Sequence, residues 1–584
     1  MAKSIRAVLL ATAAVWAVSA SAAVAQQGHL PPSSTLTGAY LSARVADDVD
    51  DLAAASVYYG QALARDTRNP NLLQRAFMTT IQSRGVIEAL PYADRLSEVD
   101  ASATAARLAI LADDFRRRDF IAAMEIADSL TPTGVLQYVM PFAEAWIYAG
   151  QGDGEAALAA LEPLETLPGF ESLYLMHVAL ISDLLEMPAA GAYYDSALAA
   201  SGGTTELLIE AAGSYFARQG MIERAAVLFD DYLANHPTAE AIQQARQRLD
   251  EGAPMGRPID SEADGLGEAL YQLGNALSEE GADDLALIYT RLAAFLRPDA
   301  LPVQLLLGRT LESAGMPHAA LATFDGIDRA TPHGYVAGIE QAGLLAGMER
   351  YAEAESILLD LAERRPTITQ AELQLADLLR SQEEYARAVE AYDRAAAIDP
   401  TLSDDDWTFL YRRAIALERL DRFEEAETDF LAALELNPDY PHLLNYLGYS
   451  WADRGINIER AEEMILRANE LEPNNGYIVD SVGWVYYRTG RLDEAVEWLE
   501  RAVALLPDDP EINDHLGDAY WMVGRRLEAR FQWQRALTFA EPEDDTRIIA
   551  IERKLAEGLT EPGILSGFTG DLAVEGEPGA SEDP

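Results

Sequence analysis

The chain has 584 residues, a formal net charge of −52 and no cysteine. The lack of cysteine excludes disulfides, thiolate metal sites, cysteine nucleophiles and a lipidated-cysteine anchor, and 96 acidic against 44 basic side chains disfavour nucleic acid and anionic lipid as partners. With 49% apolar residues, mostly Ala and Leu, and only 8% aromatic residues, the composition favours an all-α protein.

Residues 1–25 have the features of a secretory signal peptide. A basic N-terminus precedes an apolar run from Val8 to Val18, and residues 23–25 have the small-x-small pattern of a signal-peptidase site. The run is shorter than the ~20 residues that span a bilayer. We therefore expect cleavage after Ala25, a periplasmic mature protein without a direct membrane span, and a short N-terminal linker at 26–35.

A period of 34 residues runs through the helical sequence. Pro298, Pro332, Pro366 and Pro400 end helical stretches and are each 34 residues apart. Later stops with nearly the same spacing are Pro438, Pro473 and Pro507. A 34-residue period in helical sequence is typical of tetratricopeptide repeats.

Each period also contains small residues where two antiparallel helices must cross closely. In the unit that starts at Gly476, Gly483 is the small residue, Leu499 lies at the matching packing position, and Gly490 supplies the turn between the helices, where a positive φ is favourable for glycine. The next unit repeats this pattern with Gly517, Trp533 and Gly524.

The units from Leu301 to Glu543 resemble the tetratricopeptide-repeat (TPR) family. The residues that fall at the family positions include Gly308, Leu311, Ala320, Phe324 and Pro332, and again Leu447, Gly448, Trp451, Ala468 and Pro473. The resemblance implies an all-α TPR solenoid, a right-handed superhelix of antiparallel helix pairs.

Extending this register predicts fourteen units and a domain organisation. Because the units that start at 206 and 267 are 61 residues apart and Gly and Pro gather between them, we expect a bend there that lets two blocks separate. The expected parts are a degenerate N-terminal TPR block at 36–239, a linker or bend at 240–266, a C-terminal TPR block at 267–543, a capping helix at 544–557 and an acidic disordered tail at 558–584.

The sequence shows no catalytic or metal-binding pattern. None of the seven His residues has H-E-x-x-H spacing, the glycines at 150–154 lack the Lys of a P-loop, and there is no G-x-S-x-G motif. His515 and Asp518 share a helix face, and we interpret them as a surface hydrogen-bonded pair. We therefore expect no enzymatic activity, no cofactor and no metal.

Partner binding is expected on the face of each first helix that does not pack in the core. In the unit that starts at Gly476, Val479, Val482 and Tyr486 follow helical spacing toward the core and leave the opposite face free. The groove residues predicted by the same count in three units are Asn445, Tyr446, Tyr449, Asp480, Trp484, Tyr487, Arg488, Asp514, His515, Asp518 and Trp521. Their aromatic side chains are suited to binding hot spots, although each could instead pack against a neighbouring repeat.

The segments 444–449, 480–487 and 515–521 are similar to the C-terminal repeats of large Gram-negative envelope TPR proteins, including outer-membrane adaptors of carboxyl-terminal processing proteases. Those adaptors carry a lipidated Cys, which this chain lacks. The resemblance implies a non-catalytic periplasmic scaffold that binds envelope proteins through its concave groove. The alternative is an envelope protein that binds or modifies polysaccharide through the groove aromatics.

Overall fold

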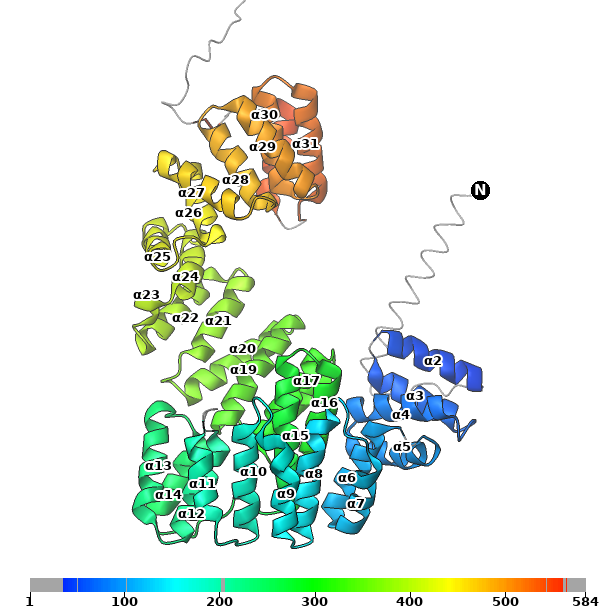
Figure 1. The fold of residues 1–584 in the computed structure, drawn as a ribbon. Helices are drawn as coiled ribbons and strands as arrows, with labels where there is room; N and C mark the ends of the chain where they lie inside the picture. The colour runs from blue at the N-terminus through cyan, green and yellow to red at the C-terminus, as the bar shows by residue number, and fades with distance from the viewer. Residues whose placement is uncertain are drawn as a thin grey trace, which may run out of the picture. The chain divides into compact units, whose positions relative to one another are not determined.

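A computed structural model describes residues 35–564, except for residues 50, 101, 201–204, 542–543 and 560–562. These described residues form 31 helices and no strand, which confirms the all-α class (Figure 1). The chain divides into two compact units, residues 1–357 and 358–584. The expected signal peptide at 1–25, nearly all of the linker at 26–35 and most of the tail at 558–584 lie outside the described residues.

The first unit contains the helices up to α20, within which the division falls. Its helices are α2 (Leu36–Asp48), α3 (Leu52–Leu63), α4 (Pro70–Ser83), α5 (Val86–Val99), α6 (Thr104–Arg117), α7 (Phe120–Ser129), α8 (Leu136–Gly150), α9 (Gly154–Glu165), α10 (Glu171–Leu184), α11 (Ala190–Ala199), α12 (Glu206–Arg218), α13 (Ile222–Asn235), α14 (Glu240–Asp250), α15 (Glu262–Glu279), α16 (Asp283–Leu296), α17 (Leu301–Ser313), α18 (Pro317–Asp325), α19 (Pro332–Gly347) and α20 (Tyr351–Arg364).

The second unit continues the same alternation to the C-terminal helix. Its helices are α21 (Gln370–Ser381), α22 (Tyr385–Ile398), α23 (Leu402–Asp405), α24 (Trp407–Arg419), α25 (Phe423–Leu436), α26 (Pro441–Arg454), α27 (Ile458–Leu471), α28 (Gly476–Arg488), α29 (Leu492–Leu505), α30 (Pro510–Met522), α31 (Arg526–Phe539) and α32 (Asp545–Glu557).

Apart from α14, α23 and α32, the helices follow one another as fourteen pairs, as the 34-residue period predicts. First helices begin where the register places them even in the degenerate N-terminal part, for example at Leu36, Pro70 and Glu206. Their starts are stabilised locally, because side chains such as those of Asn69 and Thr205 accept a hydrogen bond from a backbone N–H of the first turn.

The small residues and turn glycines act as the sequence predicts. A Cβ added to Gly483 would lie 2.6 Å from Cγ of Leu499, so the helices α28 and α29 can approach closely only with glycine at this position. Gly490 and Gly524 have φ of 77° and 83°, which allows the chain to reverse between the paired helices.

The segment 240–266 differs from the expected linker. It contains α14, whose Ile242, Ala245 and Leu249 have helical spacing and are buried, and it contains the start of α15. Helix α14 packs against α12 and α13. Gly252, Pro254, Gly256 and Pro258 lie in the connection between α14 and α15, so the expected bend is a short junction beside an additional helix.

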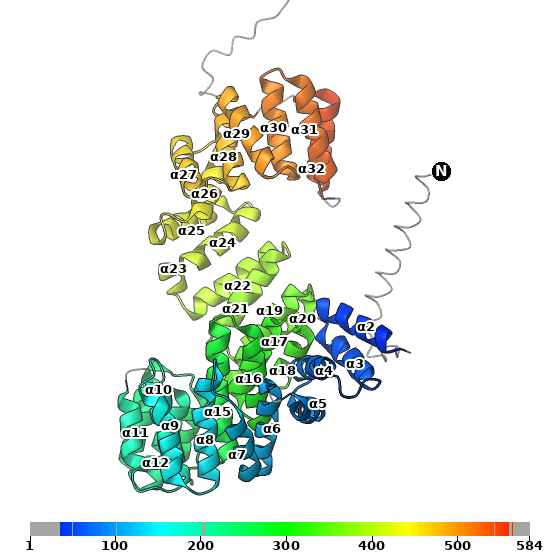
Figure 2. The same cartoon turned by 45° about the vertical axis from the view of Figure 1, so that its right-hand side comes forward.

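Contacts across this junction join the two expected blocks within the first unit. Helix α15 packs against α6 and α8, and Figures 1 and 2 both show α15 and α16 beside these earlier helices. Gly265 lies against the indole of Trp146 so closely that a Cβ would overlap with it, and Arg118 pairs with Glu262 at 3.0 Å. One buried apolar cluster runs from Ala39 to Val303, so the core does not separate at 240–266.

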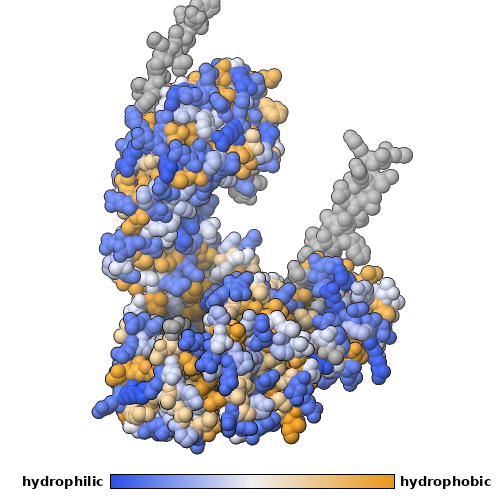
Figure 3. Space-filling view, in the orientation of Figure 1, coloured by the Kyte–Doolittle hydropathy of each residue, from blue (hydrophilic) through white to orange (hydrophobic). Residues whose placement is uncertain are grey.

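Figure 3 shows one face of the molecule by hydropathy. The face seen in Figure 3 is mostly hydrophilic, with apolar residues scattered between hydrophilic ones. None of the described helices combines the length and the apolar character needed to cross a membrane.

Candidate functional site

The predicted groove residues lie on α26, α28 and α30, the first helices of three successive repeats in the second unit. Helix α28 contacts both α26 and α30, so side chains from the three helices can meet across the repeats. Because these first helices recur once per repeat, residues about 35 apart in the sequence lie next to each other on neighbouring helices.

Trp484, Tyr487 and His515 form an aromatic stack. The ring of Trp484 lies 4.0 Å from that of His515 and 5.0 Å from that of Tyr487, with interplanar angles of 16° and 12°. Tyr487 is 0% exposed and His515 is 7% exposed, whereas Trp484 is half-buried. Packing therefore removes Tyr487 from the surface, nearly buries His515 and holds Trp484 in one orientation.

His515 forms a buried ion pair with Asp480. The imidazole Nδ1–H donates to Oδ2 of Asp480 over 2.9 Å. Burial lowers the pKa of His515, but the carboxylates of Asp480, Glu511 and Asp514 together outweigh this effect and raise the pKa to about 9. Burial raises the pKa of Asp480 against the attraction of His515. At neutral pH His515 is therefore held in its protonated form beside Asp480.

The expected surface pair of His515 with Asp518 is wrong. Asp518 is buried and accepts a hydrogen bond from the indole N–H of Trp533 over 2.9 Å. His515 instead reaches across to the preceding repeat, because Asp480 lies directly opposite it. Spacing within a single helix could not show this partner.

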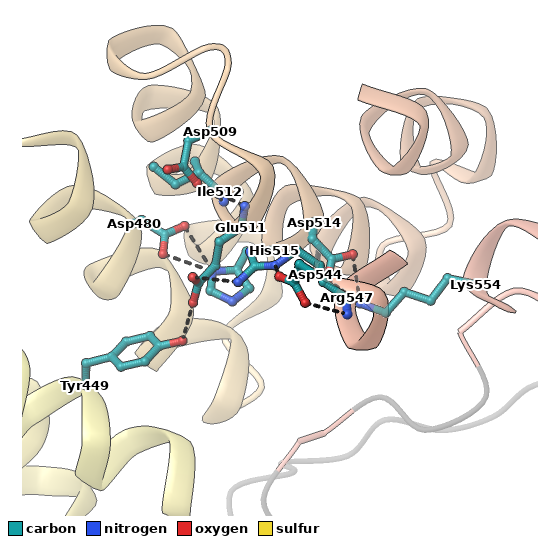
Figure 4. Close-up of polar contacts among 10 residues, drawn as sticks. All are labelled: Tyr449, Asp480, Asp509, Glu511, Ile512, Asp514, His515, Asp544, Arg547 and Lys554. Carbon is teal, nitrogen blue, oxygen red and sulfur yellow. Dashed lines mark hydrogen bonds and ion pairs between the residues drawn. The ribbon is translucent and has the colours of Figure 1, made fainter. Parts of the chain in front are cut away.

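Helix α32 supplies cations that the sequence reasoning did not include in the site (Figure 4). The ammonium of Lys554 lies 2.8 Å from Asp514 and 2.9 Å from Asp518. Arg547 donates to Glu511 over 3.4 Å, and Glu511 also accepts a hydrogen bond from the hydroxyl of Tyr449 over 3.0 Å. Lys554 is the single Lys outside residues 1–25, but it lies 40 residues from Asp514 and 36 from Asp518 in the sequence, so no spacing signal indicated this contact.

The electrostatics of this cluster depend on α32. Burial and the carboxylate of Asp514 raise the pKa of Asp518, Lys554 opposes them, and the net result is a pKa of about 6. Gly558, just after α32, lies so close to Trp521 that a Cβ would overlap with the indole. The end of α32 therefore covers part of the predicted groove at Asp514, Asp518 and Trp521.

The remaining predicted residues lie at the edge of this cluster. Tyr446 packs against Phe430 with ring centroids 5.3 Å apart, and Arg488 pairs with Asp453 at 2.9 Å. Within the described part of the chain, the amide Oδ1 of Asn445 and the indole Nε1 of Trp484 are buried and have no hydrogen-bond partner. The half-buried groove residues that we call the aromatic surface are Asn445, Tyr446, Tyr449 and Trp484.

No arrangement for metal binding is apparent among these side chains. In the described residues, no group of three or more His, Asp or Glu side chains is placed to hold a metal ion. The acids of the site are instead paired with His515, Arg547 and Lys554.

Comparisons with known proteins point to one family. Models described as tetratricopeptide repeat match residues 339–403 and 407–440, and a model described as TPR repeat matches residues 483–524. A TPR repeat-containing protein of Pseudomonas aeruginosa is 37% identical over 91 residues, which cover 16% of this chain and 15% of that protein. The aligned segment is thus a small part of this relative.

Solved structures of repeat proteins also resemble the chain. A tetratricopeptide repeat protein from Parabacteroides merdae is 14% identical, with a TM-score of 0.33, over 50% of this chain and 97% of that one. The APC/C hetero-tetramer Cut9–Hcn1 gives 15% identity and a TM-score of 0.36 over 89% of this chain and 97% of that one. From the matched repeats and the fourteen helix pairs, we conclude that the chain belongs to the tetratricopeptide-repeat family.

Proposed function

We propose that this protein is a non-catalytic scaffold that binds one or more cell-envelope proteins through the aromatic surface on α26 and α28. TPR repeats suggest a protein-interaction scaffold, and the fold is typically non-catalytic. The residues of the aromatic surface are those that the sequence register predicted to face a partner, apart from the ones that the structure buries or covers and apart from Arg488, which pairs with Asp453.

The observation that carries this proposal is the partial exposure and the unpaired indole N–H of Trp484. Its ring is held against His515 at 4.0 Å, yet it stays half-buried, and its indole N–H has no hydrogen-bond partner in the described residues. A rigid, partly exposed Trp loses little conformational entropy on binding and is a frequent hot spot. A small shift of the indole would let a partner carbonyl accept its N–H, which relieves an unpaired polar group.

The cluster beneath the surface supports the same role. The buried Asp480 is compensated by His515 and the exposed Glu511 by Arg547, so these acids contribute little unbalanced charge to the aromatic surface. Aromatic packing and hydrogen bonds, with little help from charge, should therefore dominate partner recognition here.

The envelope location of the partner is supported by the sequence. Residues 1–25 have the pattern of a signal peptide that is cleaved after Ala25, and the mature protein would then reside in the periplasm. The resemblance of the C-terminal repeats to adaptors of processing proteases makes such a protease one candidate partner. Polysaccharide is the less favoured ligand, because packing takes Tyr487 and most of His515 out of reach for stacking.

The test uses the chain from residue 26 onward and two matched Trp variants. Envelope proteins that cross-link to the aromatic surface in cells are identified, and their affinity is then measured with purified protein. We expect Trp484→Ala to weaken binding by at least tenfold, because truncation of a hot-spot Trp removes about 2 kcal/mol or more. Trp498→Ala, a half-buried Trp on the second helix of the same repeat, should leave binding within about twofold.

Two results would exclude the proposal. One is a partner whose affinity is the same for Trp484→Ala as for the unchanged protein. The other is an equal loss for Trp484→Ala and Trp498→Ala, which would show a general effect on the repeat. Binding of envelope sugars that is lost in Trp484→Ala, without any protein partner, would favour the polysaccharide alternative.

A further inference from the structure

The first unit contains a cavity of about 720 Å³ far from the aromatic surface in sequence. Its walls come from α12, α14, α15 and α17, together with the start of α19. A volume of this size is within the range of about 300–1,000 Å³ found for pockets that hold small ligands. It is larger than a defect left by imperfect packing of side chains.

The additional helix α14 builds one wall of this cavity. Its Ile242, Ala245 and Leu249 are buried, while Glu240 and Gln244 line the cavity. The N-terminus of α14 is tied to α12, because the backbone N–H of Ala241 donates to the carboxylate of Glu206 over 3.2 Å. The interruption of the 34-residue period is therefore the feature that encloses this space.

The cavity is amphipathic. On α15, Glu268, Tyr271, Gln272 and Asn275 follow helical spacing and present one face to it. Apolar side chains from the other walls include Leu207, Leu301, Pro302, Leu305 and Leu306. Such a lining can take an apolar body on one side and a polar group on the other.

Both arginines that line the cavity have ion-pair partners, whereas Glu210 has none among the described residues. Arg297 pairs with Glu268, and Arg309 pairs with Glu340 at 2.7 Å, so both arginines of the cavity already have carboxylate partners. No ion pair or hydrogen bond is found for the carboxylate of Glu210 among the described residues. Burial and the nearby carboxylate of Glu206 together raise the pKa of Glu210 to about 7, against the opposing effects of Arg248 and Arg297.

An unpaired carboxylate in a partly enclosed space is unfavourable, and either a proton or a cation relieves it. We propose that this cavity is a second binding site, which takes an organic cation with an ammonium or guanidinium group against Glu210 and Glu206 and an apolar stem against Tyr271 and Leu305. This site is independent of the proposed partner surface, because it shares no residue with it. The cation can be the side chain of a Lys or Arg in a bound peptide or a free alkyl amine.

The experiment uses the chain from residue 26 onward and isothermal titration calorimetry at physiological salt, which screens unspecific attraction to the acidic protein. The probes are n-pentylamine, a capped Ala-Ala-Lys-Ala-Ala peptide and the same peptide with norleucine in place of Lys. We expect saturable one-to-one binding of the peptide, the amine or both. The norleucine peptide, which has a similar stem without charge, should bind at least about tenfold more weakly.

Variants locate the binding in the cavity. Glu210→Gln keeps the shape of the side chain and should weaken cation binding by about tenfold or more. Glu223→Gln removes one charge from the exposed side of α13, outside the cavity, and should change the affinity less than about twofold. Gln244 is exposed and lines the cavity, so Gln244→Arg adds a guanidinium at the cavity wall. This positive charge should also weaken binding of a cation, and it tests the site without altering Glu210.

The outcomes separate the sources of the cation. Binding of the Lys peptide alone assigns the site to a peptide side chain, and binding of pentylamine alone assigns it to a free amine. The proposal is overturned if neither probe binds at millimolar concentration, or if Glu210→Gln and Gln244→Arg bind as well as the unchanged protein. Equal losses in Glu210→Gln and Glu223→Gln would also overturn it, since they would show attraction to the overall charge.

Discussion

Replacing Lys554 by Met tests whether ionic contacts hold α32 on the last repeat. Lys554 contacts Asp514 and Asp518 at 2.8 and 2.9 Å, and the side chains of Lys554 and Asp518 are 19% and 8% exposed. Met has a similar length and no charge, so the substitution leaves two neighbouring carboxylates without their cation. Only Ile551 of α32 is fully buried, so little apolar burial compensates for the loss.

The expected magnitude follows from this burial. Removing one partner of a fully buried ion pair costs about 3–5 kcal/mol. Because Lys554 and Asp514 keep partial access to water, we expect about 2–3 kcal/mol here. Since 1.4 kcal/mol corresponds to a factor of ten, the population with α32 detached should rise about 30- to 150-fold.

Hydrogen exchange of the α32 amides measures this population directly. Lys554→Met should accelerate their exchange by that factor, and adding Asp514→Asn and Asp518→Asn should restore much of the protection by removing the unpaired charges. Arg553→Met is the matched control, because Arg553 is 62% exposed and pairs only at the surface. Unchanged exchange in Lys554→Met, or equal acceleration in Arg553→Met, would refute the reasoning.

Three further predictions follow from the contacts. Because the pKa of His515 is raised, the stabilisation that His515 gives the second unit is complete below pH about 6.5 and is lost as the pH rises through about 9. Urea unfolding at several pH values should show this loss. An identical pH profile for His515→Gln would contradict the prediction. Gly517→Ala should lower the melting temperature because its Cβ would overlap with a Trp ring, whereas Gly343→Ala, which meets no atom, should raise it slightly or leave it unchanged. Proteolysis between α14 and α15 should leave two fragments that co-elute in gel filtration, and separate elution would support the separable blocks.

Local and periodic features could be predicted from the sequence alone. The helix pairs, their starts and the turns at Gly490 and Gly524 follow from spacing, because each depends on residues within one repeat. The close approach of Gly483 to Leu499, where α28 packs against α29, was predictable for the same reason. The positions of the groove residues on α26, α28 and α30 also follow from the helical register.

Partners from different repeats were decided only by the tertiary structure. Nothing in the period indicates that Asp480 meets His515, that Lys554 lies on Asp514, or that Gly265 packs on Trp146. The Gly- and Pro-rich residues after α14 suggested that the whole segment 240–266 is a linker. Residues 240–250 instead form a helix with buried residues at helical spacing, and this helix is one wall of the cavity. Periodicity determines how a repeat folds on itself, whereas contacts between distant elements depend on how the repeats stack, which one repeat does not encode.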